Sequence, residues 1–264
     1  MKNLEEERLG EIRKNKESLG GYTMKIIEYN GRNNIWIEFQ DENKSKVHTQ
    51  YGNFEKGNVK NPYHPSVFGV GYYGVGKYKS RGKDKKKTIA YKSWIMMLQR
   101  CYDPYTINKR LTYIDCYVCD EWLCFQNFAE WYYKNYYECN NEEMHLDKDI
   151  LIKGNKIYSP ETCVFVPQRI NSLFTKSDAS RGKYPIGVSW HKASNKFMTQ
   201  CSIFDKENNK KQMYLGYYNT SEEAFLAYKQ FKENYIKQVA DEYKKLIPNK
   251  LYDALYRYEV NIGD

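Results

Sequence analysis

Residues 144–174 read MHLDKDILIKGNKIYSPETCVFVPQRINSLF, and this stretch decides how the middle of the chain folds. A turn signal at Gly154-Asn155 is followed by the apolar run 163–166, and a helical pattern that contains Asn171 follows Pro167. The stretch therefore predicts two short strands and then a helix. Residues able to bind a metal ion or to move a proton gather in the first strand: His145, Asp147, Lys148 and Asp149.

This order of elements resembles the ββα-metal finger of the HNH endonucleases, whose core motif begins H-x-D-H. In that family the hairpin supplies a general base and the helix supplies a metal ligand. His145 and Asp147 match the first positions. Lys148 stands where the family has its water-activating histidine, and Glu161 stands where an asparagine usually orients that histidine. The resemblance implies two sets of site residues, namely Lys148, His145 and Glu161 for catalysis, and His145, Asp147, Asp149 and Asn171 for Mg²⁺.

The altered base position bears on activity. A lysine side chain, with a usual pKa of about 10.4, offers almost no free base at pH 7. A histidine side chain, with a usual pKa of about 6.5, offers a large fraction of free base at that pH. Asp147 and Asp149 alternate with His145 along a strand, so their oxygens could hold Mg²⁺ on one face. The finger therefore resembles a degenerate HNH site with weak or no cleavage. Two alternatives stay open: an active metal-dependent nicking endonuclease, and a charged hairpin tip that faces solvent.

Residues 184–231 form the second informative stretch, in which three short β runs precede a capped helix. Thr220 lies three residues before Glu223, which is the spacing of a capping box. Ala224, Ala227 and Tyr228 then recur at helical spacing and predict a face that packs back on the sheet. Because side chains alternate across a strand, the opposite face of the sheet is free to enter a DNA major groove.

This stretch resembles the plant ethylene-response-factor (AP2-type) DNA-binding domain. The matching residues are Gly187-Val188, Lys196-Phe197, Leu215-Gly216, Thr220, Glu222-Glu223-Ala224 and Ala227-Tyr228. By the family's register, the DNA-facing side chains are Ser189, His191, Gln200, Ser202, Gln212 and Tyr214, with Lys192, Lys196, Lys210 and Lys211 near phosphates. The arginines with which the plant proteins read guanine are absent, so guanine-rich specificity is not implied. The alternative is a sheet that packs only against another domain.

A basic run follows a segment in which glycines alternate with aromatic residues and valines at 68–78. The glycines fit either a backbone that lies close to a nucleic-acid strand or a flexible linker. The basic residues are Lys79, Arg81, Lys83, Lys85, Lys86 and Lys87. This run is either a solvated loop or a clamp for DNA phosphates.

The composition favours an acidic partner, because the net charge of the 264-residue chain is +9. Double-stranded DNA or a nucleoprotein complex is the expected partner, and the oligomeric state is open. No stretch approaches the apolar length of a membrane span, and the charged residues 1–10 do not fit a secretory signal. The seven cysteines predict reduced thiols in the cytoplasm, which would be the host cytoplasm for a phage protein. Cys116 and Cys119 form a single CxxC pair, so zinc is not expected.

These patterns predict an α+β chain with several parts. A charged helix or tail at 1–21 precedes a small antiparallel β module at 22–66, with strands near 24–29, 35–39, 47–51 and 54–59. A Gly/Lys-rich linker at 67–88 leads to a helical HNH-like domain at 89–176, with helices near 89–103 and 121–137. A polar linker at 177–182, the AP2-like sheet and helix at 183–246, and a C-terminal helix within 247–264 complete the chain.

An HNH finger joined to an AP2-type domain resembles the architecture of phage-borne homing endonucleases. The sequence therefore predicts a DNA-binding protein of phage or mobile-element type on a degenerate HNH scaffold. The first alternative is an active HNH homing or nicking endonuclease. The second is a phage anti-defence protein that acts on a host nucleoprotein.

Overall fold

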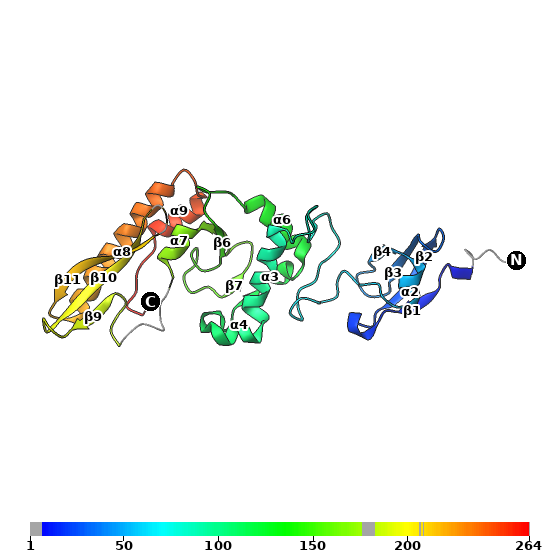
Figure 1. Cartoon of the computed structure of the whole chain (residues 1–264), viewed down its shortest axis with the longest axis horizontal. Helices are drawn as coiled ribbons and strands as arrows, with labels where there is room; N and C mark the ends of the chain where they lie inside the picture. Colours follow the sequence, from blue (N-terminus) through cyan, green and yellow to red (C-terminus); the bar gives the residue numbers. More distant parts are fainter. Residues whose placement is uncertain (1–6, 176–182, 206, 208, 264) are drawn as a thin grey trace. The chain divides into compact units, whose positions relative to one another are not determined.

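The protein is described by a computed structural model that covers residues 7–175, 183–205, 207 and 209–263 (Figure 1). The chain divides into two compact units between Lys134 and Asn135. Both contain helices and sheets, as the α+β class requires. Residues 1–6 and the expected linker at 177–182 lie outside the described residues. No helix in the described part of the chain has the length and apolar character needed to cross a membrane.

The first unit begins with a four-stranded antiparallel sheet in the order β1-β2-β3-β4. The strands are β1 (Ile12–Lys14), β2 (Thr23–Tyr29), β3 (Ile35–Phe39) and β4 (Lys46–Thr49), with a 3-10 turn η1 (Glu17–Leu19) between the first two. Alternate residues of β2 and β3, such as Met24, Ile26 and Ile37, are fully buried in one core. The three central strand predictions are confirmed.

Two expectations for this module are wrong. The segment expected as a charged helix or tail contributes the edge strand β1, which pairs with β2. The fourth expected strand is instead the helix α2 (Tyr51–Glu55). Helical spacing brings Tyr51 and Phe54 to the same side, where both rings enter the core of the sheet.

The glycine-rich segment 67–78 is an ordered part of the first unit and not a flexible linker. A side chain at Gly71 would come within 2.4 Å of Leu98, so only glycine allows this close packing. The Gln126 side chain accepts a hydrogen bond from the Tyr78 amide (2.9 Å) and donates one to its carbonyl (2.9 Å). The segment is therefore fastened to the helices beside it.

The helices of this unit are α3 (Ile89–Tyr102), α4 (Pro104–Lys109), α5 (Asp120–Leu123) and α6 (Phe125–Asn135), with η2 (Leu111–Tyr113) and the short strand β5 (Tyr117–Val118) before α5. The predicted helix at 89–103 is confirmed. The helix predicted at 121–137 is divided at Cys124, because the Tyr72 backbone inserts there. Its amide donates to the Leu123 carbonyl, and its carbonyl accepts from the Phe125 amide, each at 2.9 Å.

The second unit contains the strand–strand–helix order predicted for 144–174. Strand β6 (Met144–Asp147) pairs antiparallel with β8 (Val164–Pro167), and α7 (Gln168–Leu173) follows directly. The connection is not a tight turn at Gly154-Asn155, since residues 148–163 form a long loop that includes the short strand β7 (Ile157–Tyr158). We call β6, β8 and α7 the finger.

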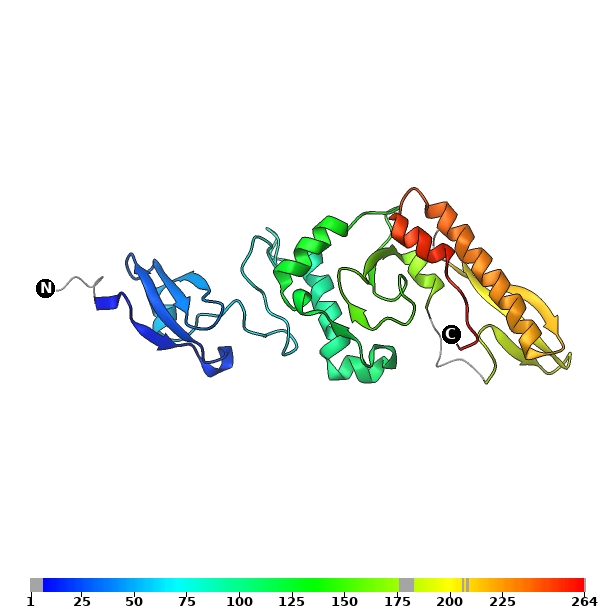
Figure 2. The same cartoon turned by 180° about the vertical axis from the view of Figure 1, so that it is seen from behind.

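The C-terminal part is a three-stranded antiparallel sheet covered by one long helix (Figures 1 and 2). The strands are β9 (Val188–His191), β10 (Lys196–Phe204) and β11 (Lys210–Tyr218), with β10 in the centre. Helix α8 (Ser221–Tyr243) packs on one face of the sheet through Phe225 and Tyr228, and α9 (Asn249–Tyr256) follows. The predicted sheet and helices are confirmed.

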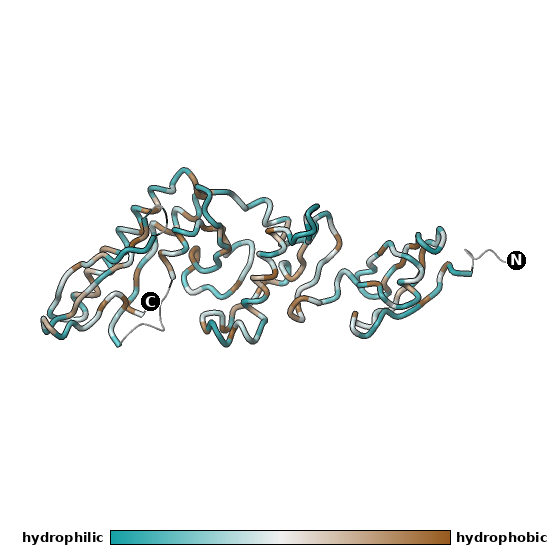
Figure 3. Tube along the Cα trace, in the orientation of Figure 1, coloured by the Kyte–Doolittle hydropathy of each residue, from teal (hydrophilic) through white to brown (hydrophobic). Residues whose placement is uncertain are grey.

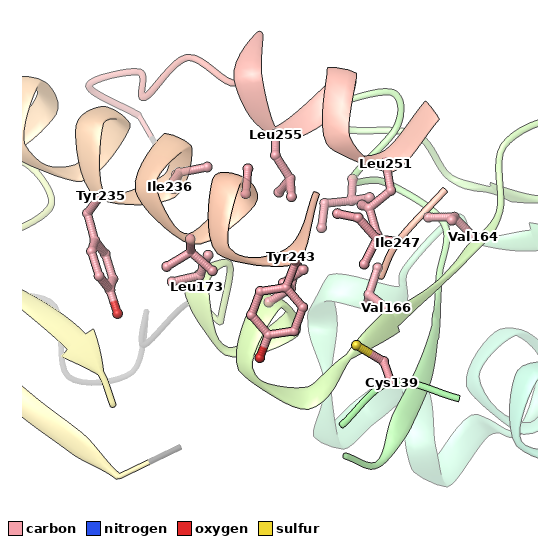
Figure 4. Close-up of a cluster of buried hydrophobic side chains, with 14 residues drawn as sticks. Cys139, Val164, Val166, Leu173, Tyr235, Ile236, Tyr243, Ile247, Leu251 and Leu255 are labelled. Atoms are coloured by element: carbon pink, nitrogen blue, oxygen red, sulfur yellow. The ribbon is translucent and has the colours of Figure 1, made fainter. Parts of the chain in front are cut away.

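The far half of α8 belongs to a second core, which it shares with the finger (Figure 4). Ile236, Val239 and Ala240 of α8 are fully buried against β8, α7 and α9. An ion pair at 2.6 Å joins the buried Arg169 guanidinium of α7 to the exposed Glu242 of α8. The finger and the sheet domain are therefore packed on one continuous helix.

Candidate nucleic-acid interface

The face of the β9–β11 sheet turned away from α8, which we call the outer face, carries the six side chains predicted to face DNA. Directly opposed residues of an antiparallel pair share a face. Gln200 opposes Tyr214, and Ser202 opposes Gln212. Across the other pair, Ser189 opposes Met198 and His191 opposes Lys196. Since residues 196, 198, 200 and 202 alternate along β10, all of these side chains lie on the outer face.

The intervening residues of β10 fix this orientation. Thr199 and Cys201 are buried toward α8, and the Thr199 hydroxyl donates to the Gly187 carbonyl at 2.9 Å. Gly187 has φ of +78°, and a side chain there would meet the Tyr228 ring at 2.1 Å. Glycine is thus required where the chain enters β9, because α8 lies directly against the backbone.

A β-bulge places two tyrosines on the outer face. The register between β10 and β11 shifts at Thr199/Gln200, so that Tyr214 opposes Gln200 while Tyr217 opposes Met198. In a regular strand, residues three apart point to opposite faces. The extra residue turns Leu215 toward the core with α8 and leaves both tyrosine rings outside, 5.5 Å apart. The sequence does not predict Tyr217 on this face, because nothing in the strand pattern marks the bulge. Met198 follows from the same alternation along β10 that places Gln200 and Ser202, so it could have been predicted.

Hydrogen bonds and ring contacts order part of the outer face. The Gln212 amide donates to the Ser202 hydroxyl at 2.9 Å. A ring nitrogen of His191 lies 2.9 Å from the Ser194 hydroxyl, and the imidazole contacts the Tyr217 ring at 5.0 Å between centroids. Tyr214 remains 52% exposed, and the Gln200 side chain has an exposed position at the centre. The surface is polar and aromatic, with several donors and acceptors available.

The four lysines assigned to phosphates divide between the two faces. Lys196 and Lys210 lie on the outer face, opposite His191 and Phe204, and Lys192 is exposed in the turn after β9. Lys211 lies on the other face, and its ammonium is 3.5 Å from the Asp205 carboxylate. The structure therefore does not group Lys211 with the other three.

An antiparallel three-stranded sheet on one long helix, with a polar and basic face turned outward, defines a two-layer domain of sheet and helix. Residues 184–238 match the AP2 domain family, which confirms the resemblance in this part of the chain. The match supports a DNA-binding protein. No curated protein and no solved structure matches the chain.

On the finger, His145 and Asp147 share one face of β6, because they oppose Val166 and Val164. Within the described part of the chain, the buried Nε2 of His145 has no hydrogen-bond partner. One oxygen of Asp147 accepts from the amides of Asp149 (2.9 Å) and Ile150 (2.7 Å), which closes the turn after β6. Burial, and then the nearby Asp149 carboxylate, raise the pKa of Asp147 to about 6.

Lys148 is buried and holds the loop together. Its ammonium donates to the Asn155 carbonyl at 2.9 Å and lies 3.1 Å from the Asp149 carboxylate. Asn155 in turn donates from its amide to the carbonyls of Lys148 (2.6 Å) and Ile157 (2.7 Å). The sequence marks Asn155 only as part of a turn signal, whereas its hydrogen bonds show that it organises the loop. Because β6 ends at Asp147, Asp149 does not continue the strand alternation that was expected.

The remaining finger residues are dispersed. Glu161 is exposed, and the hydrogen bond from the Ser159 hydroxyl (2.7 Å) lowers the pKa of its carboxyl. Asn171 is half-buried on α7. Over residues 7–175 and the other described ranges, no group of three or more His, Cys, Asp or Glu side chains could hold a metal ion, so His145, Asp147 and Asp149 do not form one. The Mg²⁺ set stays a prediction, as does the expectation about zinc at Cys116 and Cys119.

The basic run of the first unit forms an exposed hairpin before α3, and Figure 3 colours it as strongly hydrophilic. Arg81 and Lys87 form a β-bridge across it, and the Arg81 guanidinium donates to the Lys85 carbonyl at 2.7 Å. Its basic residues are all exposed: Lys79, Arg81, Lys83, Lys85, Lys86 and Lys87. Exposure of these charges is consistent with both interpretations of the run, a solvated loop and a clamp for DNA phosphates.

Proposed function

We propose that this protein binds duplex DNA through the outer face of the β9–β11 sheet. The observation that carries the proposal is the gathering of Ser, His, Gln and Tyr side chains with two lysines on that face, opposite the face that α8 covers. A major groove admits a β surface of this kind, and its base edges present the donors and acceptors that these side chains complement.

The chemistry of the face indicates how it would read DNA. The Gln200 amide lies near the centre, and a glutamine amide can donate to and accept from one adenine edge. Lys196 and Lys210 lie at the ends of their strands, where they would meet phosphates and fix the register without reading sequence. The basic hairpin at 79–87 is proposed as a second phosphate contact.

Lys210 and Lys211 provide a matched test, because they are adjacent but point to opposite faces. We expect Lys210→Met to weaken binding to mixed-sequence duplex and to reduce the slope of log K against log salt by about one. Lys211→Met should leave both unchanged. Fluorescence anisotropy over a salt series measures the two quantities. Equal effects of the two substitutions, or no binding at low salt, would contradict the proposed face.

We propose further that cleavage is weak or absent. Lys148 stands at the position of the family's base, and its ammonium is held by the Asn155 carbonyl and the Asp149 carboxylate. An ammonium has no lone pair, and a neighbouring carboxylate favours this charged form, so Lys148 is poorly suited to take a proton from water. Wild-type protein with supercoiled plasmid and Mg²⁺ should show band shift with little nicking. Lys148→His should introduce measurable nicking if the finger still positions a phosphate.

The active-endonuclease alternative rests on His145, whose buried Nε2 has no partner in the described chain. It predicts vigorous wild-type nicking that His145→Ala abolishes while DNA binding persists. That outcome would replace the proposal of a weak or absent activity. Phage origin and a host nucleoprotein as partner remain proposals that rest on the resemblance described above.

A further inference from the structure

A groove of about 960 Å³ lies beside the part of β10 that extends beyond Val188, the first residue of β9. Over the described residues, strand β9 pairs with Lys196–Thr199 of β10, and β10 continues past it without that neighbour. The groove is lined by the entry to β9 at 183–190, by Ser202 and Phe204 of β10, by Tyr228 and Lys232 of α8, and by Tyr258 near the C-terminus. We call it the edge groove. Its size is that of sites for small ligands.

The lysine at the edge groove is unusual. Lys232 is only 8% exposed, although it carries an ammonium group. In the described residues its ammonium has no hydrogen bond to an acceptor and no carboxylate partner, and its charged or ionisable neighbours are the Cys201 thiol and the Lys210 ammonium. Burial, and secondarily Lys210, lower its pKa. An unpaired ammonium is costly to bury, so a lining lysine of this kind calls for an anion.

The other side chains that line the edge groove also favour an anion. Among the described residues that line the groove there are three further lysines, namely Lys183, Lys192 and Lys210, and no aspartate or glutamate. Ser202 and Gln212 add polar groups, and Tyr184 and Trp190 add aromatic rings. Lysines with hydroxyl and amide donors suit phosphate oxygens, and aromatic rings suit a flat base.

We propose that the edge groove binds a phosphate group, which the Lys232 ammonium contacts. The phosphate could belong to a free nucleotide or to the backbone of bound DNA, since both offer the same oxygens. The inference does not depend on DNA binding by the outer face, because a free nucleotide or inorganic phosphate can occupy the groove alone.

The test compares full-length wild type with Lys232→Met by calorimetric titration and thermal unfolding. The ligands are inorganic phosphate, adenosine monophosphate and a short duplex, at constant ionic strength set with chloride. We expect at least one of them to bind wild type and to raise its melting temperature, and Lys232→Met to weaken that ligand about tenfold or more. Without ligand, Lys232→Met should melt at the same or a higher temperature, because a buried unpaired charge has been removed.

Lys211→Met is the control, because it removes a lysine outside the groove and should keep the wild-type response. Tighter binding of adenosine monophosphate than of phosphate would indicate that Tyr184 and Trp190 contact the base. If Lys232→Met weakens binding of the duplex alone, the groove holds a phosphate of the DNA backbone. If Lys232→Met destabilises the free protein, Lys232→Arg, which keeps the charge, must retain ligand binding. The proposal is wrong if no ligand binds in a manner that depends on the charge at position 232.

Discussion

The Asp147 carboxyl closes the turn after β6, and its protonation is linked to the stability of the second unit. Its pKa is raised from 3.8 to about 6, mainly by burial. The folded state therefore holds the proton more tightly than the unfolded state does. The stability gained by holding this proton is fully present below about pH 3.8, the unfolded value, and is lost as pH rises through about 6.

We therefore expect Asp147→Asn to be more stable than wild type at pH 7, by about 1–2 kcal/mol after allowance for partial solvent screening. An asparagine oxygen can still accept from the Asp149 and Ile150 amides. The difference should shrink as pH falls toward 4. Urea unfolding at several pH values measures it, with the exposed Asp253→Asn as control. A variant that is less stable than wild type at pH 7 would show that the ionised carboxylate is needed.

At the scale of single residues, the strand could be predicted from the sequence, and the loop that follows it could not. Alternation correctly put His145 and Asp147 on one face, because a strand has a fixed period. The burial of Lys148 could not be predicted, since it depends on the Asn155 carbonyl seven residues away and on how the loop closes. Local pattern carries no information about such a closure.

Among the elements, α8 begins with the capping box that its sequence predicts. The Thr220 hydroxyl accepts from the Glu223 amide, and the Glu223 carboxylate accepts from the Thr220 amide. We expect Thr220→Ala to lower the free energy of unfolding by about 1 kcal/mol. Ser221→Ala, one residue into the helix, should change it by a few tenths at most. Chemical denaturation monitored by circular dichroism compares them, and equal losses would contradict a specific role for the cap.

Strand β9 depends on the close approach of α8 at Gly187. Gly187→Ala adds a side chain that meets the buried Tyr228 ring in a left-handed backbone conformation. We expect a loss of about 2 kcal/mol or more. Gly31→Ala is the control, since the φ of Gly31 is also positive but a Cβ added there meets no described atom beyond its chain neighbours within 4 Å, so this substitution isolates the backbone cost. Equal destabilisation by both would mean that the ring contact adds nothing.

Periodic and capped elements were predictable, and their interruptions were not. The strands at 24–29 and 35–39 and the helix at 89–103 follow from hydrophobic period alone. The break at Cys124 depends on the Tyr72 backbone, more than fifty residues earlier. The bulge at Leu215-Gly216 likewise follows from pairing with β10, so the position of Tyr217 on the outer face could not be predicted from the sequence.

At the scale of a whole unit, the shared core determines which fragment can fold. The expected domain at 183–246 ends before α9 and before Val260, which is buried against α8. It would also expose Ile236, Val239 and Tyr243, whose partners lie on the finger. We expect a fragment of residues 183–246 to lack a cooperative melting transition and residues 135–264 to show one. Calorimetry decides this, and cooperative melting of the shorter fragment would contradict a shared core.

Because α8 contributes side chains to two cores, it also limits where recombination can divide the coding sequence. Its 23 residues make a rod about 34 Å long, with Phe225 and Tyr228 in one core and Val239 and Tyr243 in the other. A recombination event that cut the coding sequence on either side of this helix would leave two exposed apolar surfaces at once. Exchange between lineages should therefore preserve residues 139–260 as one block, with compensating changes appearing in pairs across α8.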